Sequence, residues 1–128
     1  MYRKIFDFPA GDKGPLYLDL GEVHILACVK LNGRDLGRVW CAPWRVEIPS
    51  GLLKPTGNEL EIRVINQWAN RLRLDGMLPE EKRLTWTPGN PYVTIDVATG
   101  GPRKLDAWQA KLDPAGLLGP VQILAVDQ

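Results

Sequence analysis

EVHILACVKLNGRDLGRVW, residues 22–40, is the stretch from which the fold is most directly read. Its first half places apolar side chains at every second position, and these are Val23, Ile25, Ala27, Val29 and Leu31. Such an alternation is typical of a strand with one buried face. Asn32 and Gly33 readily adopt the positive φ values of a type I′ turn, so residues 34–40 are predicted to return beside the strand as a hairpin.

Further strands are predicted on both sides of this hairpin. Residues 16–20 (LYLDL), 44–48 (WRVEI) and 58–66 (NELEIRVIN) each alternate apolar and polar side chains. Residues 2–8 read as an edge strand, because Pro9 has no N–H to donate to a ladder. Two later segments, 91–97 and 119–126, are predicted to complete the set of strands.

The chain of 128 residues is long enough for one hydrophobic core, so residues 1–128 are predicted to form a single domain. Its 13 Gly and 11 Pro indicate many turns between short strands. The expected fold is therefore all-β, a jelly-roll β-sandwich. Trp108 and the two leucines of AGLLGP are expected to plug it, and Ser50 is expected to cap one helical turn before Gly57.

Composition makes several classes of function improbable. A net charge of +1 gives no field that would attract nucleic acid or an anionic membrane. The longest apolar runs are far shorter than the roughly 20 residues of a membrane helix, and MYRKIFDF lacks the apolar block of a signal peptide. Cys28 and Cys41 are expected to be reduced, and with His24 as the only histidine they provide no zinc spacing.

NQWANRLRLDG, residues 66–76, opens a segment from 67 to 90 that is predicted to be irregular, because it has no sustained period. Two interpretations stay open. Asn66, Asn70 and Arg71 can bind backbone groups that leave the sheet, or they can pair with sugar hydroxyls beside the Trp68 ring. The structural interpretation is the simpler one, because buried polar groups need partners wherever they lie. Leu72 and Leu74, two residues apart, are expected to continue the core.

The remaining tryptophans suggest a second aromatic surface. Trp40 and Trp44 bracket a short Pro-containing turn, which either presents both rings to a ligand or packs them at the strand ends. Trp86 lies in RLTWTPGN, whose Thr and Pro residues place it near a loop tip, where the ring is either exposed or covers the sheet.

The sequence contains few residue patterns that are typical of catalytic or metal-binding sites. Glu80 and Glu81 are neighbours in a polar loop, which is typical of a solvated face rather than of the spaced carboxylate pair of a glycosidase. No Ser, His and Asp constellation is apparent. We therefore expect no catalysis by this chain alone and no cofactor. Calcium is conceivable at residues 11–14 or 75–81, but neither has the alternating carboxylates of a dedicated loop.

Several motifs together resemble a known family. LDLGEV, VKLNGRDLG, GNELEIRVIN, NQWANRL and AGLLGPV follow one another in the order found in the galactose-binding-like domain of glycoside hydrolases. The resemblance is to the sugar-binding domain of family 2 enzymes and, more closely, to the C-terminal module of α-L-rhamnosidase-like enzymes. It covers roughly residues 2–125. The ending RLRLDG departs from the family's RLIGD type, so no family role is carried over to Asp75.

The resemblance implies a non-catalytic module that binds carbohydrate or positions the catalytic domain of a parent glycoside hydrolase. The candidate sugar-binding residues are Trp68, Asn70, Arg71, Trp44, Trp86 and Asn66. The alternative is a docking module without sugar affinity, favoured by the apolar residues within and after NQWANRLRLDG. An exposed first strand also allows an edge-to-edge dimer. The compartment stays open, since a periplasmic and a secreted parent fit equally.

Overall fold

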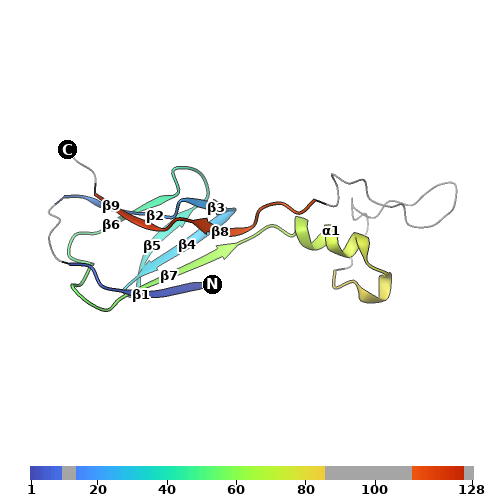
Figure 1. The fold of residues 1–128 in the computed structure, drawn as a ribbon, viewed down its shortest axis with the longest axis horizontal. Coiled ribbons are helices and arrows are strands. Elements are labelled where there is room, and N and C mark those ends of the chain that lie inside the picture. The colour runs from blue at the N-terminus through green and yellow to red at the C-terminus, as the bar shows by residue number, and fades with distance from the viewer. Residues whose placement is uncertain (10–13, 86–110, 126–128) are drawn as a thin grey trace. The chain divides into compact units, whose positions relative to one another are not determined.

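A computed structural model describes residues 1–9, 14–85 and 111–125 (Figure 1). The chain divides into two compact units. Unit 1 comprises Met1–Asn66 and Ala115–Gln128, and unit 2 comprises Gln67–Pro114. Each unit is described by itself.

One layer of unit 1 is an antiparallel four-stranded sheet with the order β1-β7-β4-β5. Its members are β1 (Tyr2–Phe6), β7 (Asn58–Ile65), β4 (Leu26–Leu31) and β5 (Arg34–Val39). The predicted type I′ hairpin is confirmed, because Leu31 pairs with Arg34 and both Asn32 and Gly33 have positive φ. β1 is an edge strand, as its sequence predicted.

The second layer contains two smaller antiparallel sheets (Figure 1). One has the order β6-β2-β9, from β6 (Arg45–Ile48), β2 (Leu16–Asp19) and β9 (Gln122–Ala125). The other pairs β3 (Glu22–His24) with β8 (Gly116–Gly119). Unit 1 is therefore an all-β sandwich, which agrees with the predicted class.

The alternating side chains of the two layers form one core. Its buried members are Leu18, Leu20, Val23, Ala27, Val29, Leu31, Val39, Val46, Ile48, Leu60 and Ile62. Full burial of a Val, Leu or Ile side chain stabilises a fold by about 1.5–3 kcal/mol. The pattern places β2, β6 and β7 as predicted, with their apolar faces inward.

The predicted strand over residues 22–31 is interrupted, and the inward position expected for Ile25 is wrong. β3 ends at His24 and pairs with β8, whereas β4 begins at Leu26 and pairs with β5 and β7. The chain passes from one layer to the other at this point, and Ile25 is left 36% exposed. Only the partners of the two strands distinguish this arrangement from one continuous strand.

Two other local predictions are also corrected. Ser50 caps no helical turn: Leu52 N–H donates to Pro49 O at 3.1 Å, and Gly51 has a φ of 76°. This is the geometry of a type II turn. The closing strand expected at 119–126 is present as the shorter β9 (Gln122–Ala125), and only Gly119 of that range belongs to β8. The predicted strand at 91–97 and the position of Trp108 lie outside the described residues.

Unit 2 begins with a helix, so the prediction of an irregular segment from residue 67 is wrong at its start. α1 (Ala69–Met77) is followed by the short 3₁₀ helix η1 (Glu80–Lys82). Ala, Leu, Arg and Met are good helix formers, although their order gives no clear apolar stripe. Leu74 is 40% exposed on this helix, so Leu72 and Leu74 do not continue a strand into the core. Within the described segments, no helix has the length and apolarity needed to cross a bilayer.

Candidate functional site

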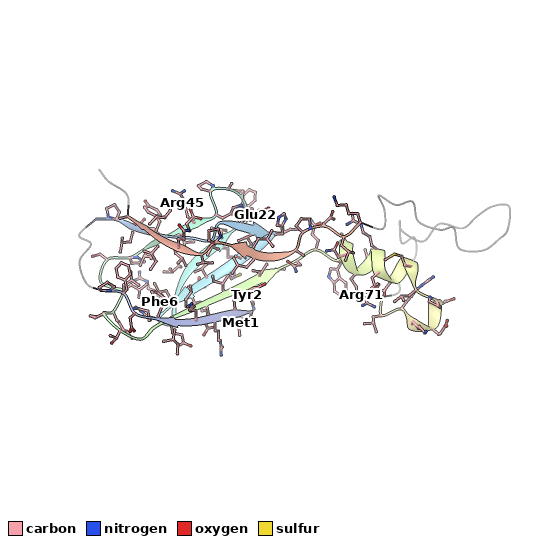
Figure 2. The ribbon with its side chains drawn as sticks, in the orientation of Figure 1. Met1, Tyr2, Phe6, Glu22, Arg45 and Arg71 are labelled. Atoms are coloured by element: carbon pink, nitrogen blue, oxygen red, sulfur yellow. The ribbon has the colours of Figure 1, made fainter. Side chains whose placement is uncertain are left out.

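A hollow in unit 1 combines two tryptophans with a carboxylate and an imidazole. Its volume is about 290 Å³, and its lining consists of Glu22, Val23, His24, Ile25, Trp40 and Trp44. These residues come from β3, from Ile25 directly after it, and from the connection between β5 and β6. Figure 2 shows Glu22 on the β3 strand that borders this hollow.

The two rings are held differently. Trp44 is half-buried and packs against the core, and its backbone oxygen accepts a hydrogen bond from Leu20 N–H at 2.8 Å. Trp40 directly follows β5 and is 69% exposed. Val23 is buried in the core beneath them. The hollow therefore has an apolar base, one anchored ring and one ring that is open to solvent.

The polar side of the hollow is formed by Glu22 and His24. Their Oε1 and Nε2 atoms lie 2.8 Å apart. Since an ionised carboxylate only accepts hydrogen bonds, the proton of this pair belongs on Nε2. In the neutral imidazole, Nδ1 is then an acceptor. Both side chains thus offer acceptors to hydroxyl groups.

In unit 2, NQWANRLRLDG turns out to form internal contacts. Asn70 pairs with the backbone of Asp113 in both directions: its Nδ2 donates to Asp113 O at 2.9 Å, and its Oδ1 accepts from Asp113 N–H at 2.9 Å. Arg73 forms an ion pair with the Asp113 carboxylate. These contacts join the first turn of α1 to the far end of the same unit.

Asp75 is the buried centre of a second cluster on α1. Its carboxylate accepts hydrogen bonds from Arg71, Thr85 and the backbone N–H of Leu84. Burial by itself raises the pKa of Asp75, but the hydrogen bonds from Thr85, Arg71 and the backbone outweigh it and hold the pKa at about 2. Arg71 and Asp75, one helical turn apart, form an ion pair with a fully buried carboxylate. This geometry favours the structural interpretation of Arg71.

The six sugar-binding candidates lie in different surroundings. Asn70 and Arg71 have protein partners, whereas Trp68 is 68% exposed and Asn66 is exposed at the end of unit 1. Of the five candidates that the structure describes, Trp44 alone lines the hollow. Trp86 lies outside the described residues.

Glu22 and His24 were missed as site residues because nothing in their local sequence marks them. Trp40 was recognised only as part of an aromatic pair with two equally natural interpretations. The available signal was the two-ring spacing of WCAPW, residues 40–44. The turn between β5 and β6 brings those rings to β3, and that pairing depends on tertiary structure.

Within residues 1–9, 14–85 and 111–125, no group of three or more His, Cys, Asp or Glu side chains is placed to hold a metal ion. Of the two segments considered for calcium, residues 11–13 are outside this range, and Asp75 is already bound to Arg71 and Thr85. Cys28 and Cys41 are both free thiols.

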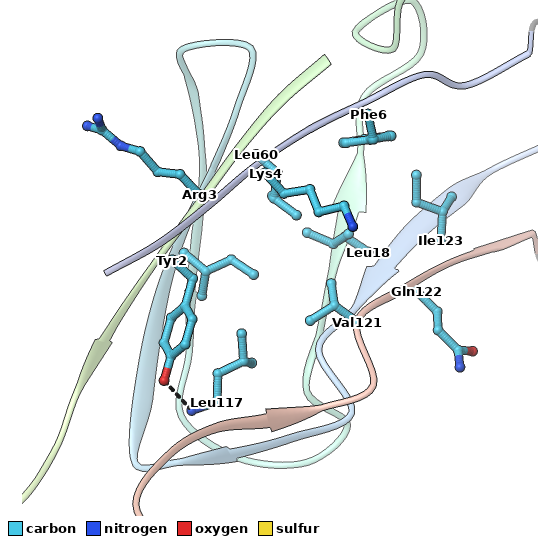
Figure 3. A pocket seen from close by; sticks show the side chains of 11 residues that line it. Tyr2, Arg3, Lys4, Phe6, Leu18, Leu60, Leu117, Val121, Gln122 and Ile123 are labelled. Carbon is cyan, nitrogen blue, oxygen red and sulfur yellow. Dashed lines mark hydrogen bonds between the residues drawn. The ribbon is translucent and has the colours of Figure 1, made fainter. Parts of the chain in front are cut away.

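A larger cavity of about 470 Å³ lies between the two layers of unit 1, beside β1 (Figure 3). Most of its lining is apolar and comes from β1, β7, β2 and the segment from β8 to β9. The polar exceptions are mainly on β1, where Arg3 and Lys4 border the cavity. At one end, Leu117 N–H donates to the Tyr2 hydroxyl at 3.5 Å.

No family model matches the chain. The chain is 37% identical over 117 residues to a protein from Formosa agariphila named "Putative beta-glucuronidase", a match that covers 84% of this chain and 10% of the relative. Among solved structures, a rhamnosidase from Novosphingobium sp. PP1Y is similar, with a TM-score of 0.70 and 36% identity over 95% of this chain and 10% of that one. The chain thus spans about a tenth of the length of each of these proteins.

Proposed function

We propose that this chain is a non-catalytic module of a glycoside hydrolase and binds carbohydrate weakly through unit 1. In this proposal the sandwich is of the jelly-roll, galactose-binding-like type. The observation that carries it is the hollow with Trp40 and Trp44 beside the Glu22–His24 pair. It occurs in a chain that is similar to a tenth of two proteins named as glycoside hydrolases.

The chemistry of the hollow suits a sugar. A pyranose presents a flat face of C–H groups, which packs on an aromatic ring, and an edge of hydroxyls, which bind to well-placed polar groups. Trp40 and Trp44 supply the first kind of contact, and Glu22 and His24 supply the second. Because the hollow is small and Trp40 is mostly exposed, we expect dissociation constants of about 1 mM.

The test is a carbohydrate titration followed by the indole N–H signals in NMR. Trp40 and Trp68 make a matched pair, because they are 69% and 68% exposed but only Trp40 lines the hollow. We expect sugar to shift the Trp40 and Trp44 signals, and Trp40→Ala to abolish binding while Trp68→Ala leaves it unchanged. If Trp68→Ala abolishes binding and Trp40→Ala leaves it unchanged, the sugar site lies in unit 2 instead.

A docking module is the second candidate, and the apolar cavity beside β1 favours it. Among the described strands, β1 has no partner on its outer side, and Tyr2 and Ile5 on this strand are 46% and 74% exposed. An apolar cavity next to a free strand edge can be covered by a strand from another polypeptide. The occupant we propose is the remainder of the parent glycoside hydrolase. A second copy is disfavoured, because antiparallel β1 strands centred on Lys4 would oppose like charges.

This candidate is testable with the Novosphingobium rhamnosidase from which the matching tenth has been deleted. Sedimentation should show a one-to-one complex with this chain, and Tyr2→Asp should weaken it. The excised region of the rhamnosidase itself is the positive control. If that region binds and this chain does not, the docking role is contradicted.

A further inference from the structure

We infer that the hollow selects uncharged sugars and discriminates against uronic acids, with Glu22 as the selecting residue. This inference rests on the proposed function, and it deepens that function by naming the class of ligand. It follows from the charges and hydrogen-bonding groups around the two tryptophan rings.

The polar side chains of the hollow present mainly hydrogen-bond acceptors to a ligand. Glu22 accepts a hydrogen bond from His24 Nε2, so the neutral ring presents Nδ1 as an acceptor. The side chains of the hollow that can bind a ligand's polar groups are therefore acceptors, apart from the indole N–H groups. Adjacent sugar hydroxyls can donate to such acceptors, whereas an ionised carboxylate has no proton to donate.

The charge of the hollow comes from Glu22. Among the residues that the structure describes, the lining contains one carboxylate and neither Lys nor Arg. With the His24 ring neutral, a uronate bound over the indoles would bring its negative charge close to Glu22 without a cation in this lining to compensate it. Two such charges about 4 Å apart in water repel each other enough to weaken binding by about fivefold, and a partly desolvated hollow increases the effect.

The aromatic walls explain why neutral sugars would still be held. Trp44 is fixed by the core, and Trp40 lies four residues earlier on the same connection between β5 and β6, so both rings border the hollow. A methyl-bearing or hydroxymethyl-bearing ring can place its C–H face against either indole. Neither contact requires a charged group on the ligand.

The experiment uses the full chain and four probes at equal ionic strength: methyl α-L-rhamnopyranoside, methyl β-D-galactopyranoside, sodium D-glucuronate and sodium D-galacturonate. The indole signals of Trp40 and Trp44 report binding. We expect the two uronates to bind at least about fivefold more weakly than the two neutral glycosides.

Glu22→Gln is the decisive variant, because glutamine keeps the shape and removes the charge. It should reduce the discrimination between neutral and acidic sugars to less than about twofold, and an unchanged amide spectrum elsewhere will show that the sandwich is intact. Glu47→Gln is the matched control, since Glu47 is an exposed carboxylate on β6 outside the lining and should leave the discrimination unchanged.

The outcomes separate the two levels of the hypothesis. Equal or tighter binding of uronates to the wild type, or discrimination that survives Glu22→Gln, would overturn the selectivity and leave the carbohydrate-binding function standing. Shifts at Trp68 alone would overturn the assignment to the hollow. If none of the probes shifts any indole signal at about 20 mM, the carbohydrate-binding function fails as well.

Discussion

Asn58 is a fully buried amide whose hydrogen-bonding groups are satisfied by neighbouring segments. Its Oδ1 accepts from Lys54 N–H at 2.8 Å and from Asn32 Nδ2 at 3.0 Å, and its Nδ2 donates to Lys54 O at 2.7 Å. A longer bond of 3.3 Å reaches Phe6 O. Asn32, in turn, accepts from Glu59 N–H. One side chain thus ties the hairpin turn, β1 and the segment before β7 together.

We expect Asn58→Ala to lower the free energy of unfolding by about 2–4 kcal/mol, because it leaves several buried backbone and amide groups without partners. The measurement is urea unfolding followed by the fluorescence of the tryptophans. Asn66→Ala is the control, since Asn66 is exposed in the same unit and its loss should change stability by less than about 0.5 kcal/mol. Equal effects of the two substitutions would contradict the role assigned to Asn58.

The Asp75 carboxylate makes the stability of unit 2 depend on acid. Its pKa is lowered from 3.8 to about 2 in the folded chain, so the ionised form stabilises the fold fully above about pH 4. This contribution is lost as the pH falls through about 2. We expect the α1 signal in circular dichroism to become less resistant to heat between about pH 4 and pH 2.

Asp75→Asn is the comparison for this prediction. The variant should be less stable than the wild type at neutral pH and should lose less stability on acidification, since the group that titrates in this cluster is gone. Parallel pH profiles for the two proteins would show that Asp75 does not contribute to the acid sensitivity.

At the scale of the elements, the second layer depends on a close approach between two glycines. Gly21 lies between β2 and β3 with a φ of 69°, and it bridges to Gly119 at the end of β8. A Cβ atom on Gly21 would lie 2.3 Å from the carbonyl carbon and oxygen of Gly119. Asp19 holds the turn by accepting a hydrogen bond from Gly21 N–H at 2.7 Å. The approach allows the two small sheets of this layer to meet.

Gly21→Ala should therefore destabilise the chain by about 3 kcal/mol or more, because the added methyl group meets backbone atoms that cannot rotate away. Gly51→Ala is a matched control: Gly51 also has positive φ, at 76°, but no described atom beyond its chain neighbours lies within 4 Å of its Cβ position. The strained backbone alone should cost about 1 kcal/mol there. Thermal unfolding of the two variants gives the comparison, and similar losses would argue against the close contact.

At the scale of the whole molecule, the chain is organised as a sandwich interrupted by a second unit. Unit 2 starts after β7 and the chain re-enters unit 1 before β8, and contacts within unit 2 join its two ends. Asn70 and Asp113, 43 residues apart, make two such bonds. Closing a loop of this length costs conformational entropy, and the paired bonds offset part of that cost.

Asn70→Ala is expected to raise the rate of amide hydrogen exchange in α1 by about tenfold, which corresponds to the loss of about 1–2 kcal/mol from two hydrogen bonds. The strands that supply the core, such as β4, should keep their protection, because both partners of the lost bonds lie in unit 2. Exchange measured residue by residue tests this. An equal loss of protection in β4 would contradict a local role for the pair.

Local sequence was sufficient for much of unit 1. The alternation in β2, β4, β6 and β7 defines a buried face whatever the strands pair with, and Asn32–Gly33 specifies its turn through backbone preferences alone. The free edge of β1 was also foreseen, from Pro9. In each case the physical cause acts within a few residues, so the sequence by itself determined the outcome.

Other features were decided by contacts between distant residues. The break at Ile25 exists because β3 and β4 pair in different layers. The α1 segment has no apolar period, and its helix is stabilised by hydrogen bonds with Asp113 and Thr85. The hollow required β3 to lie beside the turn that carries Trp40 and Trp44. No local pattern records which side chains will meet across the fold, so only the tertiary structure could join Glu22 and His24 to those rings.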